Sequence, residues 1–208
     1  MKIFVTKPQY GLIKKVLPIM ASFYRNNFEP LFQLIEEDYG LPEGAAKDAA
    51  SIIHNIQITA PAYRKAISVE DLSSTWNFPE ATEERPYNYT VELSDNQRTL
   101  LSKTLDIFSR IVMGQLHILF EALDVPDEFN KNQHMMQAYH DAYWDGGAGA
   151  KEARDILFPA IKNFGWHGGY GISNQNVAED SRLAYQLSRA LENNYALPVT
   201  SEPIILMR

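Results

Sequence analysis

The stretch KIFVTKPQYGLIKKVLPIMASFYRNNFEPLFQLIE, residues 2–36, recurs in diverged form as TVELSDNQRTLLSKTLDIFSRIVMGQLHILFEALD, residues 90–124. The two stretches align without a gap when the chain is shifted by 88 positions, and seven of the 35 aligned pairs are identical. Several other pairs exchange one aliphatic side chain for another, as Ile3 does with Val91. The sequence therefore predicts an internal duplication.

Both copies are expected to fold as a short strand followed by a capped helix. The strands are expected over Ile3–Val5 and Tyr89–Leu93. A hydroxyl residue then precedes a glutamine by three positions, as Thr6 and Gln9 in the first copy and as Ser94 and Gln97 in the second. This spacing is typical of a capping box, in which the hydroxyl accepts from a first-turn N–H group and the glutamine reaches back to the cap.

Apolar residues at three- and four-residue steps predict a long amphipathic helix after each cap. In the second copy these steps continue as far as Leu123. In the first copy Pro18 and Pro30 are expected to kink or interrupt the helix, because proline lacks the N–H group that a helix interior needs.

The predicted fold is mainly α with a small β-sheet (α+β), built from two strand–helix units in a pseudo-two-fold arrangement. Such a chain resembles a homodimer fused into one polypeptide. We expect a diverged first unit over residues 1–88 and a second unit over residues 89–208, which share one core. The expected linker is Asn77–Asn88, which has two prolines and a cluster of charges.

The rest of the chain is predicted to be mostly helical. Helices are expected over Pro42–Asn55, Pro126–Trp144 and Ala150–Phe164, the last with a kink at Pro159. Short helical turns are expected over Pro61–Ile67 and Val69–Thr75. Glycines are expected to break the chain over Asp145–Gly149 and to form a loop over Gly165–Asn176. A last helix is expected from Asn176, with a core face of Leu183, Ala184, Leu187 and Leu191, and a final strand over Pro203–Met207.

Composition excludes several classes of protein. The chain has 208 residues, no cysteine and a net charge of -7, so disulfide frameworks, thiolate metal sites and cysteine nucleophiles are ruled out. The acidic balance disfavours a polynucleotide partner, because phosphate contacts need clustered lysine and arginine. No targeting signal and no membrane-length apolar run is found, so we expect a cytoplasmic protein without a membrane partner.

The second copy resembles a known family. Its segment Ser109–Gln115 (SRIVMGQ), the later pair Gly171-Ile172 and the helix around Arg182–Leu187 (RLAYQL) are similar to a family of small uncharacterised proteins of bacteriophages and bacterial mobile elements. The resemblance covers about half of the chain, from Tyr89 to Leu191, and Gln186 stands where the family more often has an acid. It implies a phage-type accessory protein, and it carries no activity over to this chain.

Arg110 and Gln115 are the first candidate site residues, because both lie on the long helix predicted for the second copy. Gln115 falls on the apolar stripe, where an amide needs hydrogen-bond partners. One interpretation is that it bonds the backbone of Gly168–Ile172, with Gly114 allowing a close approach. The other is that Arg110 and Gln115 line a ligand pocket.

Two further groups carry candidate ligand-binding residues. The last helix places Arg182, Tyr185 and Arg189 on one flank, which is either a solvated face or a strip that recognises a phosphate and a base. The glycine-rich loop contributes Trp166, His167 and Tyr170. Its aromatic rings could close the loop on itself, or its backbone N–H groups and rings could receive a ligand.

Signals for a metal site or for catalysis are weak. His140, Asp141 and Asp145 have no diagnostic ligand spacing, and Asp145–Lys151 (DGGAGAK) lacks the ending of a phosphate-binding P-loop. We therefore expect no cofactor, no metal and no catalytic residue. Enzymatic activity stays open but is disfavoured.

The favoured function is sequestration of a phosphate-bearing nucleotide signal, by which a phage-type accessory protein would counter host defence. One alternative is an acidic inhibitor of a host protein, which could mimic a nucleic acid. The other is a nucleotide hydrolase that uses His167 or His140. Expected partners are thus a small phosphate-bearing ligand or a host protein, and a homo-oligomer stays open.

Overall fold

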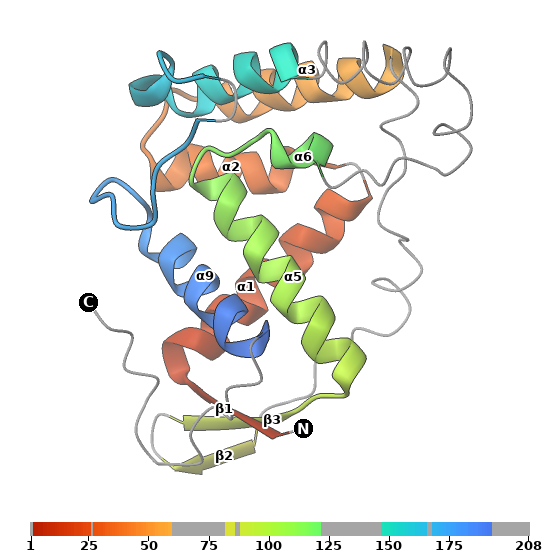
Figure 1. The fold of residues 1–208 in the computed structure, drawn as a ribbon, viewed down its shortest axis with the longest axis vertical. Helices are drawn as coiled ribbons and strands as arrows, with labels where there is room; N and C mark the ends of the chain where they lie inside the picture. The colour runs from red at the N-terminus through yellow and green to blue at the C-terminus, as the bar shows by residue number, and fades with distance from the viewer. Residues whose placement is uncertain are drawn as a thin grey trace.

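The computed structural model describes residues 2–25, 27–59, 82–85, 88–121, 147–165 and 168–192. The mainly helical class is confirmed. The sheet forms one end of the molecule, α1, α5 and α9 extend from it, and α2 and α3 lie toward the other end (Figure 1). The expected elements that lie outside the described residues are those over 61–67, 69–75, 126–144 and 203–207.

Among the described residues, the sheet has three antiparallel strands in the order β1-β3-β2. Their bounds are Lys2–Thr6 for β1, Thr82–Arg85 for β2 and Asn88–Glu92 for β3. In the register of β1 against β3, Ile3 pairs with Val91, the residue that the 88-position alignment also matches with it. The expected linker over 77–88 is wrong where β2 occupies it, since Thr82–Arg85 pairs with β3.

The two long helices have matching bounds. Helix α1 spans Lys7–Tyr24 and α5 spans Asp95–Val112, so both ends differ by 88 positions. Both predicted capping boxes are confirmed. The Thr6 N–H donates to Gln9 Oε1 over 2.8 Å, and the Ser94 N–H donates to Gln97 Oε1 over 2.8 Å.

Helix α5 ends eleven residues before the expected Leu123, because Gly114 closes it with a φ of 84°. The Gly114 N–H donates to the Ile111 carbonyl and the Gln115 N–H to the Arg110 carbonyl, both over 2.9 Å. This pair of bonds is a Schellman motif, which needs a left-handed residue that glycine adopts at little cost. A short helix, α6 (Ile118–Glu121), follows the turn.

The prolines of the first copy act differently from each other. Helix α1 continues through Pro18, so this residue does not interrupt it. The break comes after Tyr24, and α2 (Glu29–Asp38) then begins with Pro30 in its first turn. Proline is tolerated there because first-turn N–H groups have no partner within the helix.

Three expected boundaries in the second half are wrong. Gly147 and Gly149 lie within a helix over 147–157, whose buried residues Ala150, Ala153 and Leu157 outweigh the conformational cost of glycine. That helix ends before Pro159, and a short 3-10 helix, η2 (Pro159–Ile161), follows it. The last helix, α9, begins at Glu179 rather than near Asn176 and ends at Glu192.

In the first half of the chain, helix α3 spans Ala45–Thr59.

Helices α5 and α9 pack closely through two pairs of serines. The Ser181 hydroxyl donates to the Ser109 carbonyl and the Ser102 hydroxyl to the Ser188 carbonyl, each over 2.9 Å. Serine is small enough to let the two backbones approach, and its hydroxyl is satisfied in the core. The expected core face of α9 is therefore incomplete: Ser181 and Ser188 belong to it, whereas Leu183 is only partly buried.

The buried apolar residues of the described chain form one cluster, with members from residues 3–53 and from residues 91–191. Tyr39, which follows α2, connects the end of α5 with the start of α9 through two hydrogen bonds. Its hydroxyl donates to the Val112 carbonyl at the end of α5 over 2.8 Å and accepts from the Ala178 N–H over 3.4 Å. One phenol thus bridges the end of α5 and the residue before α9.

Burial of Tyr24 and Tyr39 predicts a loss of stability at alkaline pH. Burial raises the pKa of both phenols from 10.0 to about 12. Because the folded pKa lies above the unfolded pKa, this stability is complete below pH 10.0 and is lost as the pH rises toward 12. Tyr24 alone accounts for about 3 kcal/mol.

The measurement is the free energy of urea unfolding on both sides of pH 10.0. The wild-type protein should lose stability steeply above that pH. A Tyr24→Phe, Tyr39→Phe variant should start less stable, because it lacks the phenol hydrogen bonds, but should show a shallower pH dependence. Equal slopes for the two proteins would disprove the assignment to these phenols.

Candidate functional site

Arg110, Gln115 and the glycine-rich loop meet at the end of α5. Arg110 Nε donates to Gln115 Oε1 over 3.1 Å. The same two residues are the first and last residues of the Schellman motif, so their side chains as well as their backbones are hydrogen-bonded to each other. The Tyr170 N–H donates to the Met113 carbonyl over 2.7 Å. The loop therefore bonds the turn through Met113, not through the Gln115 amide as one interpretation of the sequence had it.

Glycine is required where the loop touches the turn. A Cβ atom on Gly169 would lie 2.7 Å from Gln115 Cγ, and one on Gly168 would lie 2.5 Å from Phe164 Cβ. A Cβ atom on Gly114 would lie 2.8 Å from Ile161 Cδ1. These contacts place Phe164, the two loop glycines and the Arg110–Gln115 pair next to one another.

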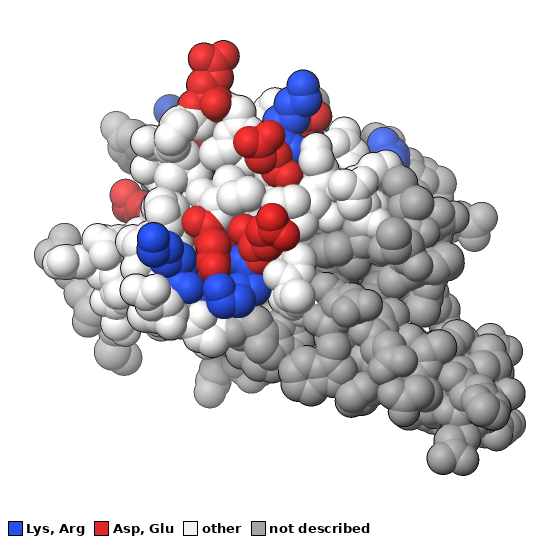
Figure 2. All heavy atoms as spheres, turned by 90° about the horizontal axis from the view of Figure 1, so that it is seen from above, with Lys and Arg blue, Asp and Glu red and all other residues white. Residues whose placement is uncertain are grey.

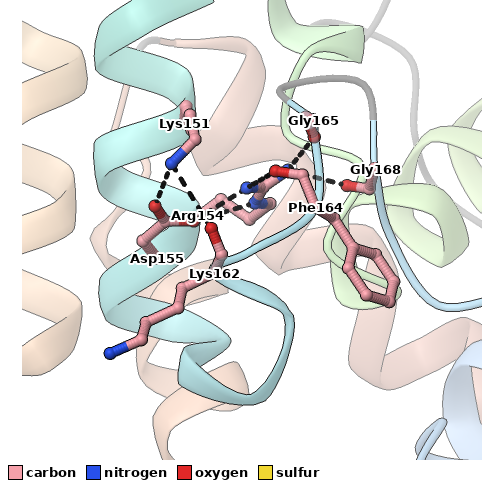
Figure 3. Close-up of polar contacts among 7 residues, drawn as sticks. All are labelled: Lys151, Arg154, Asp155, Lys162, Phe164, Gly165 and Gly168. Carbon is pink, nitrogen blue, oxygen red and sulfur yellow. Dashed lines mark hydrogen bonds and ion pairs between the residues drawn. The ribbon is translucent and has the colours of Figure 1, made fainter.

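The side chain of a buried arginine, Arg154, donates hydrogen bonds to the backbone carbonyls of the same loop. Arg154 is 0% exposed, and its Nη1 donates to the carbonyls of Gly165 and Gly168 over 2.5 and 3.2 Å. Its Nη2 donates to the Phe164 carbonyl over 3.0 Å (Figure 3). We call Phe164, Gly165, Gly168 and Gly169 the receptor loop. Three of its carbonyls are fixed by one guanidinium.

The charge of Arg154 is balanced by Asp155. Nε and Nη2 of Arg154 lie 3.2 and 2.8 Å from Asp155 Oδ1, and Lys151 Nζ lies 2.5 Å from Oδ2 (Figure 3). Burial alone would raise the pKa of Asp155, but the hydrogen bonds from Lys151 and Arg154 outweigh it and hold the pKa below its ordinary value of 3.8. All five N–H donors of Arg154 are thereby used, as a buried charge requires.

The receptor loop exposes one aromatic ring. Phe164 is 48% exposed and is the large hydrophobic residue that stands out as exposed in the described part of the chain. Its ring points away from the Arg154 guanidinium while its carbonyl faces it (Figure 3). The backbone beneath this exposed ring is therefore held in place. Trp166 and His167, predicted from the sequence as ligand-binding, lie outside the described residues.

Tyr170 packs in the interior. It is 6% exposed, and its ring stacks on Tyr39 at a centroid distance of 6.4 Å and meets Phe158 edge-on at 6.3 Å. Burial raises its pKa. In this structure Tyr170 anchors the receptor loop to the core, and its ring is not presented to a ligand.

The predicted strip on α9 is engaged in contacts within the protein. Arg189 is close to Glu192 Oε2 at 2.7 Å and to Asp106 Oδ1 at 3.8 Å, and its guanidinium lies over the Tyr185 ring at 5.1 Å. Arg182 Nη2 donates to the Asn174 carbonyl over 2.8 Å. The contacts of Arg182 and Arg189 are thus made with Asn174, Asp106, Tyr185 and Glu192, within the protein itself.

Acidic and basic side chains lie intermixed on the face seen in Figure 2. Among the described residues, no group of three histidine, aspartate or glutamate side chains could hold a metal ion. Within the same ranges, no helix is both long and apolar enough to cross a membrane.

Sequence reasoning missed Arg154 and Phe164. The signal for Arg154 was its position: it continues the buried series Ala150, Ala153 and Leu157 on the apolar face of its helix. A charged residue in such a series must find partners inside the protein. Nothing in the sequence distinguished Phe164 from a core phenylalanine.

No family model, no curated protein and no solved structure matches the chain. The candidate site is accordingly defined by the contacts given above.

Proposed function

We propose that the protein acts by binding and that its ligand is a phosphate-bearing nucleotide held by the receptor loop together with Arg110 and Gln115. The observation that carries this proposal is the exposed Phe164 ring on a loop whose carbonyls are fixed by the buried Arg154. A binding surface fixed before the ligand arrives loses little conformational entropy on binding.

The chemistry of the site fits the two parts of a nucleotide. An exposed phenylalanine can stack on a base, and the aromatic rings of Trp166 and His167 come from the same loop in the sequence. Arg110 supplies a guanidinium, which pairs with phosphate in a bidentate way. Gln115 orients that guanidinium through the 3.1 Å hydrogen bond to its Nε, which leaves the two terminal nitrogens on the other side of the group.

Sequestration, rather than turnover, is the proposed action. The resemblance of residues 89–191 to proteins of bacteriophages and mobile elements supports an accessory role of the kind that counters host defence, whereas the choice of a nucleotide as the ligand rests on the chemistry of the site. The hydrolase alternative assigns the role of general base to His167 or His140, and both residues lie outside the described part of the chain.

We further propose that the two strand–helix units are diverged copies and that only the second carries this site. Support comes from the matching bounds of α1 and α5, from the two capping boxes and from the pairing of Ile3 with Val91. Ser22 and Asn27 stand at the positions of Arg110 and Gln115. Neither can supply a guanidinium.

Thermal shift against cyclic nucleotides, cyclic dinucleotides and ADP-ribose tests the proposal. At a ligand concentration of about 100 Kd, a ligand that binds only the folded protein adds about 2.7 kcal/mol of stability, so at least one of these nucleotides should raise the Tm. Phe164→Ala and Arg110→Ala should each remove most of that rise. Phe164 is exposed, so its replacement should leave the fold intact.

Two matched variants serve as controls. Phe164→Tyr keeps the aromatic ring and should keep the shift, and Arg25→Ala removes an exposed arginine at the end of α1, the counterpart of α5. If no nucleotide raises the Tm, or if Phe164→Ala and Arg110→Ala respond like these controls, the proposed function is wrong. Capture of one host protein at unit stoichiometry in that case would favour the acidic inhibitor.

A further inference from the structure

We infer that the receptor loop binds the phosphate group through backbone N–H groups, those of Gly165 and Gly169, and that Arg154 is the positioning residue that turns them outward. This inference rests on the proposed function for the identity of the ligand. It assigns the anion-binding atoms, which the sequence left open.

The first step is the inward direction of the loop carbonyls. The Phe164, Gly165 and Gly168 carbonyls all accept from the Arg154 guanidinium. Arg154 is fully buried, so these carbonyl oxygens point toward the interior of the protein. A carbonyl that accepts from a charged donor is held more firmly than one that accepts from a neutral donor.

The second step follows from the geometry of the peptide bond. The described chain has no cis peptide bond, and in a planar trans peptide the N–H group points opposite to the carbonyl of the same unit. The inward carbonyl of Phe164 therefore directs the Gly165 N–H outward, and the inward carbonyl of Gly168 does the same for Gly169. Neither N–H group has a hydrogen-bond acceptor among the described residues, whereas those of Gly168 and Tyr170 do.

The third step is electrostatic. Two peptide units with their negative ends turned to a buried cation present their positive ends on the other side, and backbone N–H groups that are turned away from the protein's own acceptors can donate to an anion, as successive N–H groups do in anion-binding nests. Gly169 also lies against Gln115, whose side chain holds Arg110. A phosphate at Gly169 would thus lie near a guanidinium, and the absence of a side chain on Gly169 lets it approach the backbone there.

Amide NMR with inorganic phosphate as the probe tests the inference. In a titration of the full chain labelled with nitrogen-15, the Gly165 and Gly169 amide protons should move downfield and saturate. Gly11 and Gly40 supply controls, since Gly11 lies within α1 and the Gly40 N–H already donates to the Glu37 carbonyl. Shifts at Gly165 and Gly169 no larger than those at Gly11 would overturn the inference.

Arg154→Lys tests the role of positioning. Lysine keeps the charge but lacks the planar fork that holds three carbonyls, so phosphate affinity should fall about tenfold, the equivalent of one lost charge-assisted hydrogen bond. Unchanged affinity in a folded variant would contradict the assignment. If Arg154→Lys does not fold, Gly165 gives a second test, because a Cβ there meets nothing within 4 Å: Gly165→Ala should keep binding and Gly165→Pro, which lacks the N–H, should lose it.

The two proposals fail in different ways. Nucleotide stabilisation that depends on Phe164 and Arg110, without phosphate shifts at Gly165 and Gly169, would overturn the inference and leave the proposed function standing. Saturable phosphate shifts at both glycines, with no nucleotide raising the Tm, would overturn the proposed function and leave the anion-binding loop established.

Discussion

Replacing Arg154 by methionine should destabilise the protein by about 3–5 kcal/mol, the range found when one partner of a buried ion pair is removed. Methionine is unbranched and fills irregular space well, so the loss is not mainly one of packing. It comes from the carbonyls of Phe164, Gly165 and Gly168, which lose their donors, and from Asp155, which keeps Lys151 but loses one of its two counter-charges.

The measurement is the free energy of urea unfolding, with Arg189→Met as the matched control. Arg189 also pairs with acidic residues, but its side chain is 48% exposed, so its replacement should cost no more than about 1 kcal/mol. Native-state hydrogen exchange should in addition show faster exchange of the receptor loop in Arg154→Met. A loss as small as that of Arg189→Met would contradict the structural role given to the buried guanidinium.

Gly114→Ala should destabilise the protein by about 3 kcal/mol. Its φ of 84° is a left-handed conformation, which costs a residue with a side chain roughly 1–2 kcal/mol. The new Cβ would also lie 2.8 Å from Ile161 Cδ1 and 3.4 Å from the Phe158 ring, and overpacking of this kind typically costs about 1–3 kcal/mol.

Gly11→Ala is the control with the opposite sign. Gly11 lies inside α1, and a Cβ there meets nothing within 4 Å. Alanine should therefore stabilise the protein by about 0.5–1 kcal/mol through its higher helix propensity. If both glycine variants changed the free energy of unfolding in the same direction, the claim that position 114 requires glycine would be wrong.

The local elements at the start of each copy were predictable because their signals are local. The Thr6–Gln9 and Ser94–Gln97 boxes each involve four consecutive residues, and both strands lie next to them. The end of α5 was missed because apolar spacing continues past Gly114 to Leu123, and periodicity alone does not report that a turn lies within it. Glycine in a predicted helix is a weak signal until the φ angle is known.

The candidate site was predictable only in part, because some of its residues are positioned by contacts with residues far away in the sequence. Arg110, Gln115 and the glycine-rich loop were chosen from the sequence, and the structure brings them together. The sequence could not show that Tyr170 turns into the core against Tyr39, or that Arg189 is engaged by Asp106 and Glu192. Those contacts depend on how α5, α9 and the residues after α2 pack.

The most direct test of the central claim is native mass spectrometry of the full chain mixed with cyclic nucleotides, cyclic dinucleotides and ADP-ribose. The account predicts that the wild-type protein and Arg25→Ala each retain a single nucleotide per chain, and that Arg110→Ala and Phe164→Ala lose it. A wild-type protein that retains no nucleotide, or retention that is equal in all four proteins, would contradict the claim that the receptor loop and Arg110 form a nucleotide-binding site.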